Sequence, residues 1–596
     1  MGRILLCLTW LAAAGVSAER PNIIWVIAED ASPHIGPYGE TVIRTPNLDR
    51  MAAEGVKFEY AFVTNPVCSP SRSAMVSGMY QTTLGAHNHR SQSDIAKSGG
   101  NVAYYESYRT PASIKLIPEL FAGAGYYVAN GGKGKTDYNF IARSELYASK
   151  DWSGRAAGQP FFAQVQLPGG KNRQAKVSPM TDPAAVKLPP YYPDHPQLRE
   201  DWAQYLNSWV ATDGYVGELL ARLEKDGTLE DTVIFFWTDH GVSHIRGKQF
   251  LYDEGIRVPL MVRFPNKKHG GTVRRDLVTQ IDVAATSLVL AGIPIPDYVQ
   301  GRPLFSNGYQ AREYVFTARD RCDETVDTIR SARTERFKYI RNFRYFRAHT
   351  QPNQYKDGKR IMKTMRALHG EGKLSELQSR AFAPRRPVEE LYDLRADPFE
   401  TVNLAAKAEY QETTAKLRSE LYNWMVSSRD MGIVPEPILE DLGRKYGTKY
   451  DAMRHPDQRG LIEELIRVAD AGAAGDTAAL KEALASPRPA VRYWAAMGLG
   501  NTGRAGDAKL LAPLLRDTDA VVRVAAARGL AMFGDERAVA ALAREIGHEN
   551  LLVGLYAIRA IEELGERAKT AAPEVLKALH SPYDGTQRIA RRLTGQ

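Results

Sequence analysis

Two uninterrupted apolar segments, each ending in polar ligand-type residues, constrain this fold more than any other feature of the sequence. The segments are Asn22–Ala28 and Thr232–Thr238. A strand without polar alternation is buried on both faces, which is typical of a largely parallel sheet covered by helices. Open α/β sheets place their sites at the carboxyl ends of such strands. We therefore expect a shared site from the four residues that follow the segments, Glu29, Asp30, Asp239 and His240.

The chain around these segments alternates helical and extended patterns. Helices are predicted at Asp49–Gly55 and Ser113–Ala124, and a further apolar strand at Pro160–Val165. Strands that alternate with helices indicate an α/β domain, which we place at residues 19–310. Shorter extended segments and one helix follow in residues 311–433. They predict a small antiparallel subdomain whose strands are Tyr314–Thr317, Thr328–Arg333, Phe337–Asn342 and Glu390–Leu394.

The C-terminal part of the chain is repetitive. Gly503, Gly534 and Gly565 are 31 residues apart, and each follows a helical stretch. Helix pairs at this period predict an all-α solenoid in residues 461–596, in which each unit buries its apolar face against its neighbours. The units resemble short HEAT repeats, so a protein partner is expected there rather than catalysis. A segment rich in proline and charge, 434–460, is predicted to be a linker.

The first 18 residues are predicted to be a signal peptide rather than part of the fold. An apolar run, Ile4–Ala14, follows Arg3, and small residues precede the expected cleavage after Ala18. The run is shorter than the ~20 residues that span a bilayer. We therefore expect a periplasmic or secreted protein. The mature chain keeps two cysteines, Cys68 and Cys322, which either pair or stay free.

One short string narrows the chemistry that this sheet edge supports. It reads Cys68-Ser69-Pro70-Ser71-Arg72. Here the chain resembles the type I, formylglycine-dependent sulfatases of the alkaline phosphatase-like superfamily, whose signature is Cys-x-Pro-x-Arg. Further landmarks of that family follow in the same order, namely Gly131–Lys135, Asp239–Gly241, Gly247–Lys248 and Glu254–Pro259. The resemblance covers residues 20–430 and includes features of the sulfamidase-like branch. It implies a large mixed sheet flanked by helices and a small antiparallel subdomain.

The resemblance also implies a modified nucleophile and a bound cation. In this family a maturation enzyme oxidises the cysteine to Cα-formylglycine. One hydroxyl of the aldehyde hydrate attacks sulfur, the other later releases sulfate, and a divalent cation polarises the sulfuryl oxygens. Carboxylate ligands suit Ca²⁺ or Mg²⁺. The positions that match the family's metal ligands are Glu29, Asp30, Cys68, Asp239 and His240.

By the same resemblance, several cations are candidate catalytic residues. Arg72 is expected to hold the nucleophile and the ligand carboxylates through charge-assisted hydrogen bonds. Lys248 is expected to contact the leaving sulfate. The segment Gly131–Lys135 contains two lysines, and either Lys133 or Lys135 matches the family's active-site lysine, depending on which neighbouring residues anchor the alignment.

The histidine that usually protonates the leaving group in this family is missing after the Phe-Phe strand. Lys171 and His244 are the two candidates for a replacement acid. Two polar loops that resemble the sulfamidase-like branch are expected to line the mouth where a sugar binds. Together with Lys171, their candidate residues are His87, Asn88, His89, Arg90 and Arg321. Cys322 lies in the second loop and is expected to be a free, buried thiol.

These features favour an exported hydrolase that removes sulfate ester or sulfamate groups from a sulfated carbohydrate, with an N-sulfoglucosamine unit as one plausible substrate. A phosphonate or phosphate ester hydrolase of the same superfamily is the alternative enzyme. A third reading is an inactive protein that binds a polyanion through the helical repeats. The formal charge of +9 is mild over 596 residues, and no nucleic acid partner is expected.

Overall fold

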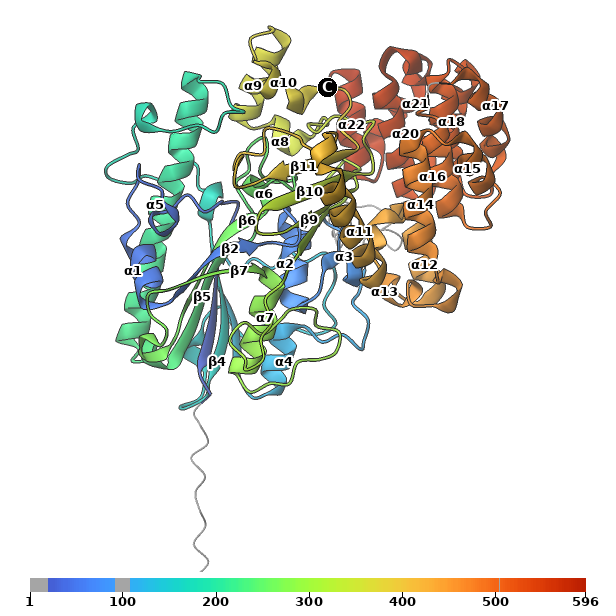
Figure 1. Ribbon diagram of the computed structural model, residues 1–596. Coiled ribbons are helices and arrows are strands. Elements are labelled where there is room, and N and C mark those ends of the chain that lie inside the picture. The colour runs from blue at the N-terminus through green and yellow to red at the C-terminus, as the bar shows by residue number, and fades with distance from the viewer. Residues whose placement is uncertain (1–19, 92–107, 503) are drawn as a thin grey trace, which may run out of the picture.

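A computed structural model describes residues 20–91, 108–502 and 504–596 (Figure 1). The predicted signal peptide, residues 1–18, and Gly503 lie outside these ranges. Within them, no helix has both the length and the apolar character needed to cross a membrane.

Seven strands form one mixed sheet in the order β3-β4-β1-β5-β6-β2-β7. β1 pairs in parallel with β4 and β5, whereas β6 runs antiparallel to β5 and β2. The strands are β1 Asn22–Ala28, β2 Val56–Phe62, β3 Tyr127–Gly132, β4 Phe161–Leu167, β5 Thr232–Thr238, β6 Arg257–Arg263 and β7 Thr272–Thr279. The two uninterrupted apolar segments are therefore neighbours, β1 and β5, and both are buried along their whole length.

Helices cover both faces of this sheet. Alternate residues of β1 pack to opposite sides: Trp25 joins the core under α2, α4 and α7, and Val26 joins the core under α1 and α5. The helices are α1 Pro46–Glu54, α2 Cys68–Ser77, α3 Gln81–Leu84, α4 Ile117–Gly123, α5 Pro196–Lys225, α6 Asp253–Ile256 and α7 Gln280–Leu290. The predicted helix Ser113–Ala124 begins only at Ile117, because proline is favoured in the first turn of a helix and Pro118 occupies it.

A second sheet of four antiparallel strands follows, in the order β11-β10-β9-β8. Its strands are β8 Val315–Arg319, β9 Ile329–Arg333, β10 Phe337–Asn342 and β11 Glu389–Asp393, and α11 (Gln411–Ser427) packs on it. The expected small antiparallel subdomain is therefore present. Between β10 and β11 the chain adds three helices that the sequence analysis did not predict, α8 Gln354–Asp357, α9 Arg360–Gly370 and α10 Glu376–Ser379.

The C-terminal residues form a stack of helices, in which α14, α16, α18 and α20 pack in succession. The main helices are α14 Leu461–Ala474, α15 Thr477–Ala483, α16 Pro489–Leu499, α17 Ala508–Leu511, α18 Ala520–Met532, α19 Glu536–Arg544, α20 Leu551–Leu564, α21 Ala572–Lys577 and α22 Asp584–Thr594. The segment that we expected to be a linker, 434–460, contains two further helices, α12 Glu436–Tyr446 and α13 Lys449–Ala452. α12 packs on α20 of the repeats.

One hydrophobic core joins the repeats to the rest of the molecule. It runs from Ala74 of α2 through the small sheet to Ile589 of α22. Polar contacts cross the same boundary, because Nε1 of Trp494 donates to the carbonyl oxygen of Ile433 at 2.8 Å. The helical repeats are therefore packed against the region that contains the two sheets rather than tethered to it (Figure 1).

Candidate active site

The ends of β1 and β5 bring the predicted strand-end residues together. The backbone N–H of Asp239 donates to the carbonyl oxygen of Ala28 at 2.9 Å, which continues the pairing of the two strands. The N–H of Asp30 donates to Oδ1 of Asp239 at 3.0 Å. Asp30 has φ of 49°, a left-handed conformation that is uncommon for aspartate and clusters at functional sites. Asp30, Asp239 and His240 are all fully buried.

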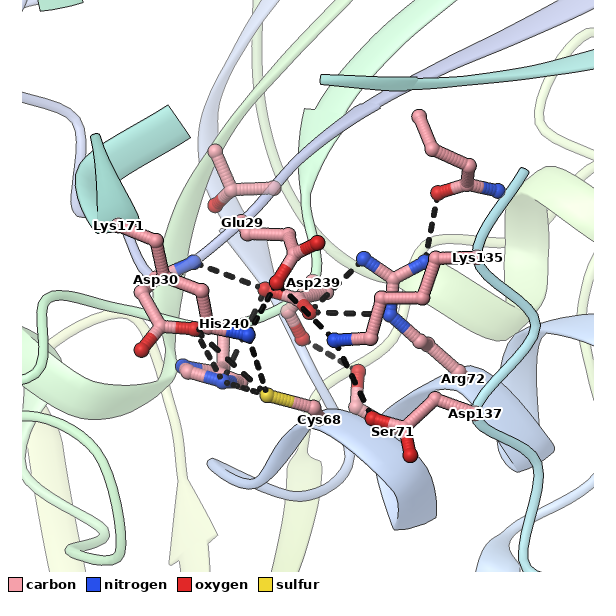
Figure 2. A network of polar contacts seen from close by, with 12 residues as sticks. Glu29, Asp30, Cys68, Ser71, Arg72, Lys135, Asp137, Lys171, Asp239 and His240 are labelled. Atoms are coloured by element: carbon pink, nitrogen blue, oxygen red, sulfur yellow. Dashed lines mark hydrogen bonds and ion pairs between the residues drawn. The ribbon is translucent and has the colours of Figure 1, made fainter. Parts of the chain in front are cut away.

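Helix α2 carries Cys68 and Arg72 to this strand edge. Cys68 is the first residue of the ten-residue helix, where the helix dipole favours negative charge. Its Sγ lies 3.1 Å from Nε2 of His240 and 3.6 Å from Oδ1 of Asp30. Arg72 follows one turn later on the same face. Its Nη2 forms an ion pair with Oδ2 of Asp239 at 3.0 Å. Figure 2 shows the two side chains facing each other.

Two glycines after β4 let Lys171 reach the same site. A Cβ on Gly169 would lie 2.3 Å from the carbonyl oxygen of Glu29, and a Cβ on Gly170 would lie 2.1 Å from that of Asp30. Only glycine fits such a close approach of two backbones. The next residue, Lys171, then forms an ion pair with Glu29, and its Nζ lies 3.5 Å from Sγ of Cys68 (Figure 2).

Three lysines surround the cysteine, and we call Lys135, Lys171 and Lys248 the inner cluster. Nζ of Lys248 lies 3.1 Å from Sγ of Cys68 and 3.3 Å from Oδ2 of Asp30. Burial alone would raise the pKa of Cys68, but the three lysines lower it to about 6. The site therefore stabilises negative charge at residue 68.

Four residues are arranged as a metal site. The candidate ligand atoms of Asp30, Cys68, Asp239 and His240 all lie within 4.8 Å of one another. Nδ1 of His240 lies 2.8 Å from the carbonyl oxygen of Gly241. Burial lowers the pKa of His240, but Asp239, Cys68 and Asp30 raise it above its ordinary value. In the neutral ring, the contact with Gly241 places the proton on Nδ1, because a carbonyl oxygen only accepts, and leaves the Nε2 lone pair for a cation. Two carboxylates and an imidazole match the donors that divalent cations take.

Glu29 contacts two lysines, whereas the sequence analysis expected it to be a metal ligand. Its Oε2 lies 3.0 Å from Nζ of Lys135 and is also paired with Lys171. Glu29 is therefore paired with the inner cluster and is not one of the four candidate metal ligands. Of the two candidate lysines in the Gly131–Lys135 segment, Lys135 points into the site (Figure 2). Lys133 is exposed on the preceding turn.

A pocket of about 420 Å³ opens above Cys68, within the usual size range of small-ligand sites. Its lining residues are Cys68, His89, Arg90, Lys135, Asp137, Lys171, Lys248, Cys322, Asp323, Gln354, Tyr355 and Arg588. Tyr355 closes one side, where its hydroxyl donates to Oδ2 of Asp30 at 3.2 Å and its ring lies 4.7 Å from Nζ of Lys248.

The two polar loops expected at the pocket mouth lie against each other. The N–H of His89 donates to the carbonyl oxygen of Arg321 at 3.0 Å, and the N–H of Arg321 donates to Oδ1 of Asn88 at 3.2 Å. His89 and Arg90 line the pocket, whereas His87 and Asn88 are buried outside its lining.

Arg321 also lies outside the pocket lining, where it pairs with Glu436 of α12 at 2.6 Å and so connects the loop to the repeats' side of the molecule. Cys322 is a free, buried thiol, as expected.

His244, an expected alternative acid, lies away from this pocket. It is fully buried, and its Nε2 lies 2.9 Å from Oδ1 of Asp201 and 3.1 Å from Nη2 of Arg173. Burial and Arg173 lower the pKa of His244 to about 4, although Asp201 opposes this change. Among the residues that line the pocket, Lys171 is the remaining candidate for the missing histidine.

Sequence reasoning missed Asp137, Gln354, Tyr355 and Arg588. Asp137 follows Lys135 by two residues, with which it forms an ion pair at 3.2 Å, so its position in the lysine segment was an available signal. Tyr355 and Arg588 come from a helical insertion and from the last repeat, where no motif marks them. Their roles follow only from the way in which those segments fold back over Cys68.

Comparison with known families matches three parts of the chain. The Sulfatase family model matches residues 21–293, and a model described as N-sulphoglucosamine sulphohydrolase, C-terminal, matches residues 240–381. HEAT repeat models match residues 477–550 and 508–593.

Two curated relatives cover most of the same region. An ulvan-active sulfatase of Formosa agariphila is 35% identical over 468 residues, which are 71% of this chain and 77% of the relative. Human N-sulphoglucosamine sulphohydrolase is 24% identical over 493 residues, which are 73% of this chain and 96% of the human protein.

Solved structures share the fold at lower identity. A structure from work on the metabolism of multiple glycosaminoglycans by Bacteroides thetaiotaomicron has a TM-score of 0.51 and 19% identity, and covers 69% of this chain and 97% of that one. A phosphonate monoester hydrolase from Silicibacter pomeroyi has a TM-score of 0.50 and 16% identity, with coverage of 70% and 97%. These two show the fold alone. The Formosa relative and the family matches show that this chain belongs to the sulfatase family of sulfuric ester hydrolases.

Proposed function

We propose that this chain is an exported sulfatase that removes sulfate ester or sulfamate groups from a sulfated carbohydrate, with residue 68 as the nucleophile. The observation that carries the proposal is the convergence of Cys68 and three lysines in one pocket, next to the buried carboxylates of Asp30 and Asp239. Relatives named as an ulvan-active sulfatase and an N-sulphoglucosamine sulphohydrolase support a saccharide substrate. Export rests on the signal-like sequence of residues 1–18.

The proposal includes a divalent cation, Ca²⁺ or Mg²⁺, held by Asp30, Asp239 and His240 next to residue 68. The donor set fits, because two buried carboxylates lie close together and supply the oxygen ligands that these cations prefer. The neutral ring of His240 adds Nε2 as a further donor. A bound cation supplies Lewis-acid polarisation of the sulfuryl oxygens. Arg72 keeps Asp239 ionised and oriented through two contacts of 3.0 and 3.1 Å.

The proposal also includes conversion of Cys68 to Cα-formylglycine by a maturation enzyme. The hydrate of that aldehyde supplies two hydroxyls on one carbon, one as nucleophile and one to release the sulfate. The residues 68 to 72, with the cysteine at the helix N-terminus, support this modification.

In the proposed reaction, the lysines of the inner cluster bind the sulfate group and supply a proton. Lys248 and Lys171 lie 3.1 and 3.5 Å from Sγ of Cys68, so their ammonium groups are positioned to bind the sulfate oxygens around the nucleophile. Lys171 holds a proton at Nζ within reach of a leaving oxygen or nitrogen. Lys135 and Glu29 form an ion pair at 3.0 Å, which fixes the positions of both side chains next to Lys171.

Mass spectrometry and sulfate release test the proposal together. A tryptic peptide containing residue 68 should be about 18 Da lighter than the thiol form, as expected when a methylene thiol becomes an aldehyde. The matured enzyme should release free sulfate from members of a panel of defined N- and O-sulfated saccharides, and should be slower on a phosphodiester or phosphonate ester. A matured protein that hydrolyses the phosphorus esters and none of the sulfated saccharides would contradict the proposal.

A further inference from the structure

The last helix of the repeats contributes a side chain to the pocket that contains Cys68. Arg588 lies on α22 and is one of the residues that line this pocket. Figure 1 shows α22 on the side of the repeats that faces α8 of the catalytic region. The pocket is therefore built from opposite ends of the chain, and the helical repeats form part of its wall.

Contacts to the loop after β8 hold Arg588 in this position. Its Nη1 lies 3.7 Å from Oδ1 of Asp323 and 3.5 Å from Oε2 of Glu324. Arg592, one turn later, donates to Oε1 of Glu324 at 2.8 Å. The same oxygen accepts the backbone N–H of Gln354, the first residue of α8, at 2.7 Å. Glu324 is fully buried, so α22 is fixed to the catalytic region at this point.

Basic side chains are in excess at the mouth of the pocket. We call His89, Arg90 and Arg588, which surround Asp323, the outer cluster. Nδ1 of His89 lies 3.0 Å and Nη1 of Arg90 lies 3.9 Å from Oδ1 of Asp323. Arg588 also pairs with Glu324 and Asp584, but the pocket lining as a whole contains six basic side chains and only two carboxylates, those of Asp137 and Asp323. This excess of basic side chains in the lining favours an anion in the pocket.

The inner and outer clusters differ in depth. The side chain of Lys248 is 5% exposed, whereas those of Arg588 and Arg90 are 19% and 55% exposed. The inner cluster borders the nucleophile and the outer cluster borders solvent. A guanidinium group presents paired N–H donors that match the two oxygens of a carboxylate or sulfate.

On the basis of the proposed function, we propose that Arg588 and Arg90 bind a second anionic group of the saccharide, a carboxylate or a second sulfate, while the inner cluster binds the sulfate that is removed. The helical repeats then contribute to substrate selection, because Arg588 recognises a part of the substrate that does not react. Arg588 is a specificity residue and lies outside the reacting group.

The test compares substrates that differ in one charge. The matured full-length enzyme is assayed on a sulfated disaccharide with a uronic acid, on the same disaccharide with its carboxylate reduced to an alcohol, and on a disulfated form of the reduced compound. 4-Nitrophenyl sulfate serves as the substrate without a second anion. Arg588→Gln should raise KM about tenfold or more on a doubly anionic disaccharide, the size expected for a lost charged hydrogen bond. The carboxylate and disulfate arms identify which anion is recognised.

Two further variants separate recognition from folding. Arg591→Gln removes a charge from the exposed side of the same helix, where the side chain of Arg591 donates to Gln587. It should change every rate by less than about twofold. Arg90→Gln tests the outer cluster through a side chain that is half exposed and not part of the interface between α22 and the loop. It should show the same loss on doubly anionic substrates.

Three results would overturn the inference. The first is an equal loss for Arg588→Gln on 4-nitrophenyl sulfate and on the doubly anionic disaccharides, which would indicate a structural role. The second is no loss for either Arg588→Gln or Arg90→Gln on any doubly anionic substrate. The third is a wild-type enzyme with the formylglycine mass that releases no sulfate, in which case the proposed function fails as well. A wild-type enzyme that is active but shows either of the first two results leaves the proposed function intact.

Discussion

The end of the large sheet and the last helix of the repeats face one pocket but hold their side chains in different ways. Asp30, Asp239 and His240 follow directly from β1 and β5 and are fully buried. Arg588 stands on a surface helix at the other end of the chain, with part of its side chain exposed. The register of the two strands fixes the positions of Asp30, Asp239 and His240 as precisely as catalysis requires. A residue on a helix at the pocket mouth can be substituted without moving the reacting atoms.

This difference suggests that reaction and selection reside in separate regions. Changes in the inner cluster should then reduce turnover of every sulfated substrate, small or large. Changes in the outer cluster should affect only substrates that carry a second anion. The continuous core between the two regions adds a third expectation, that they unfold together.

The largest effect is expected at the nucleophile. Cys68→Ala should lower kcat on 4-nitrophenyl sulfate by roughly 10⁴-fold or more, the scale of nucleophile removal in other hydrolases. The thermal unfolding midpoint should stay close to that of the wild type, because the substitution only shortens a small side chain. Cys322→Ala, at the outer side of the same pocket, provides the comparison and should keep at least about a tenth of the activity. Retained turnover in Cys68→Ala would rule out this nucleophile.

The second largest effect is expected at the interface between the catalytic region and the helical repeats. Trp494 of α16 is buried, packs near Phe343 and donates to Ile433, so Trp494→Ala should cost about 3–5 kcal/mol of stability. Leu542→Ala, in the interior of the repeats, serves as the comparison. In both variants, circular dichroism and residual activity should fall at the same lowered temperature. Activity that persists after the repeats have melted would show that the two regions are independent.

Removal of the metal should have a smaller but still large effect. Dialysis against EDTA should lower activity roughly 100-fold or more, since even groups that only support metal ligands contribute 10–100-fold. Ca²⁺ or Mg²⁺ should restore it. The restoring ion should also stabilise the folded protein, by about 2.7 kcal/mol at 100 times its Kd. Asp30→Asn should abolish that thermal shift, and a shift that persists would place the metal elsewhere.

The sequence predicted that the residues at the ends of two strands lie together, because an apolar strand pattern and polar residues that follow it coincide there. Segments 22–28 and 232–238 are apolar without interruption, so their strands were recognised with both boundaries correct, and their polar successors share an edge. The 31-residue period likewise predicted the repeats, because each helix must bury one face against the next.

What the sequence did not predict depends on contacts between distant segments. The proline-rich segment 434–460 was expected to be a linker, yet α12 within it is fixed by the Arg321–Glu436 pair. Tyr355 and Arg588 lie in no recognisable motif, since only the packing of α8 and α22 brings them over Cys68. The choice between Lys133 and Lys135 likewise needed the turn geometry, which exposes one and directs the other to Glu29.

Substitution of Lys135 and of Lys133 should have the smallest of the expected effects, and it tests the inner cluster most specifically. Lys135→Ala should lower kcat/KM on 4-nitrophenyl sulfate about 10- to 100-fold, because a cation that helps to stabilise charge at residue 68 is lost. Lys133→Ala removes the same charge two residues away on an exposed turn, and should change the rate by less than about twofold. Because both variants lose one lysine from one segment, long-range charge alone would reduce both rates equally. An equal loss would therefore mean that the inner cluster acts by overall charge rather than by the position of its ammonium groups.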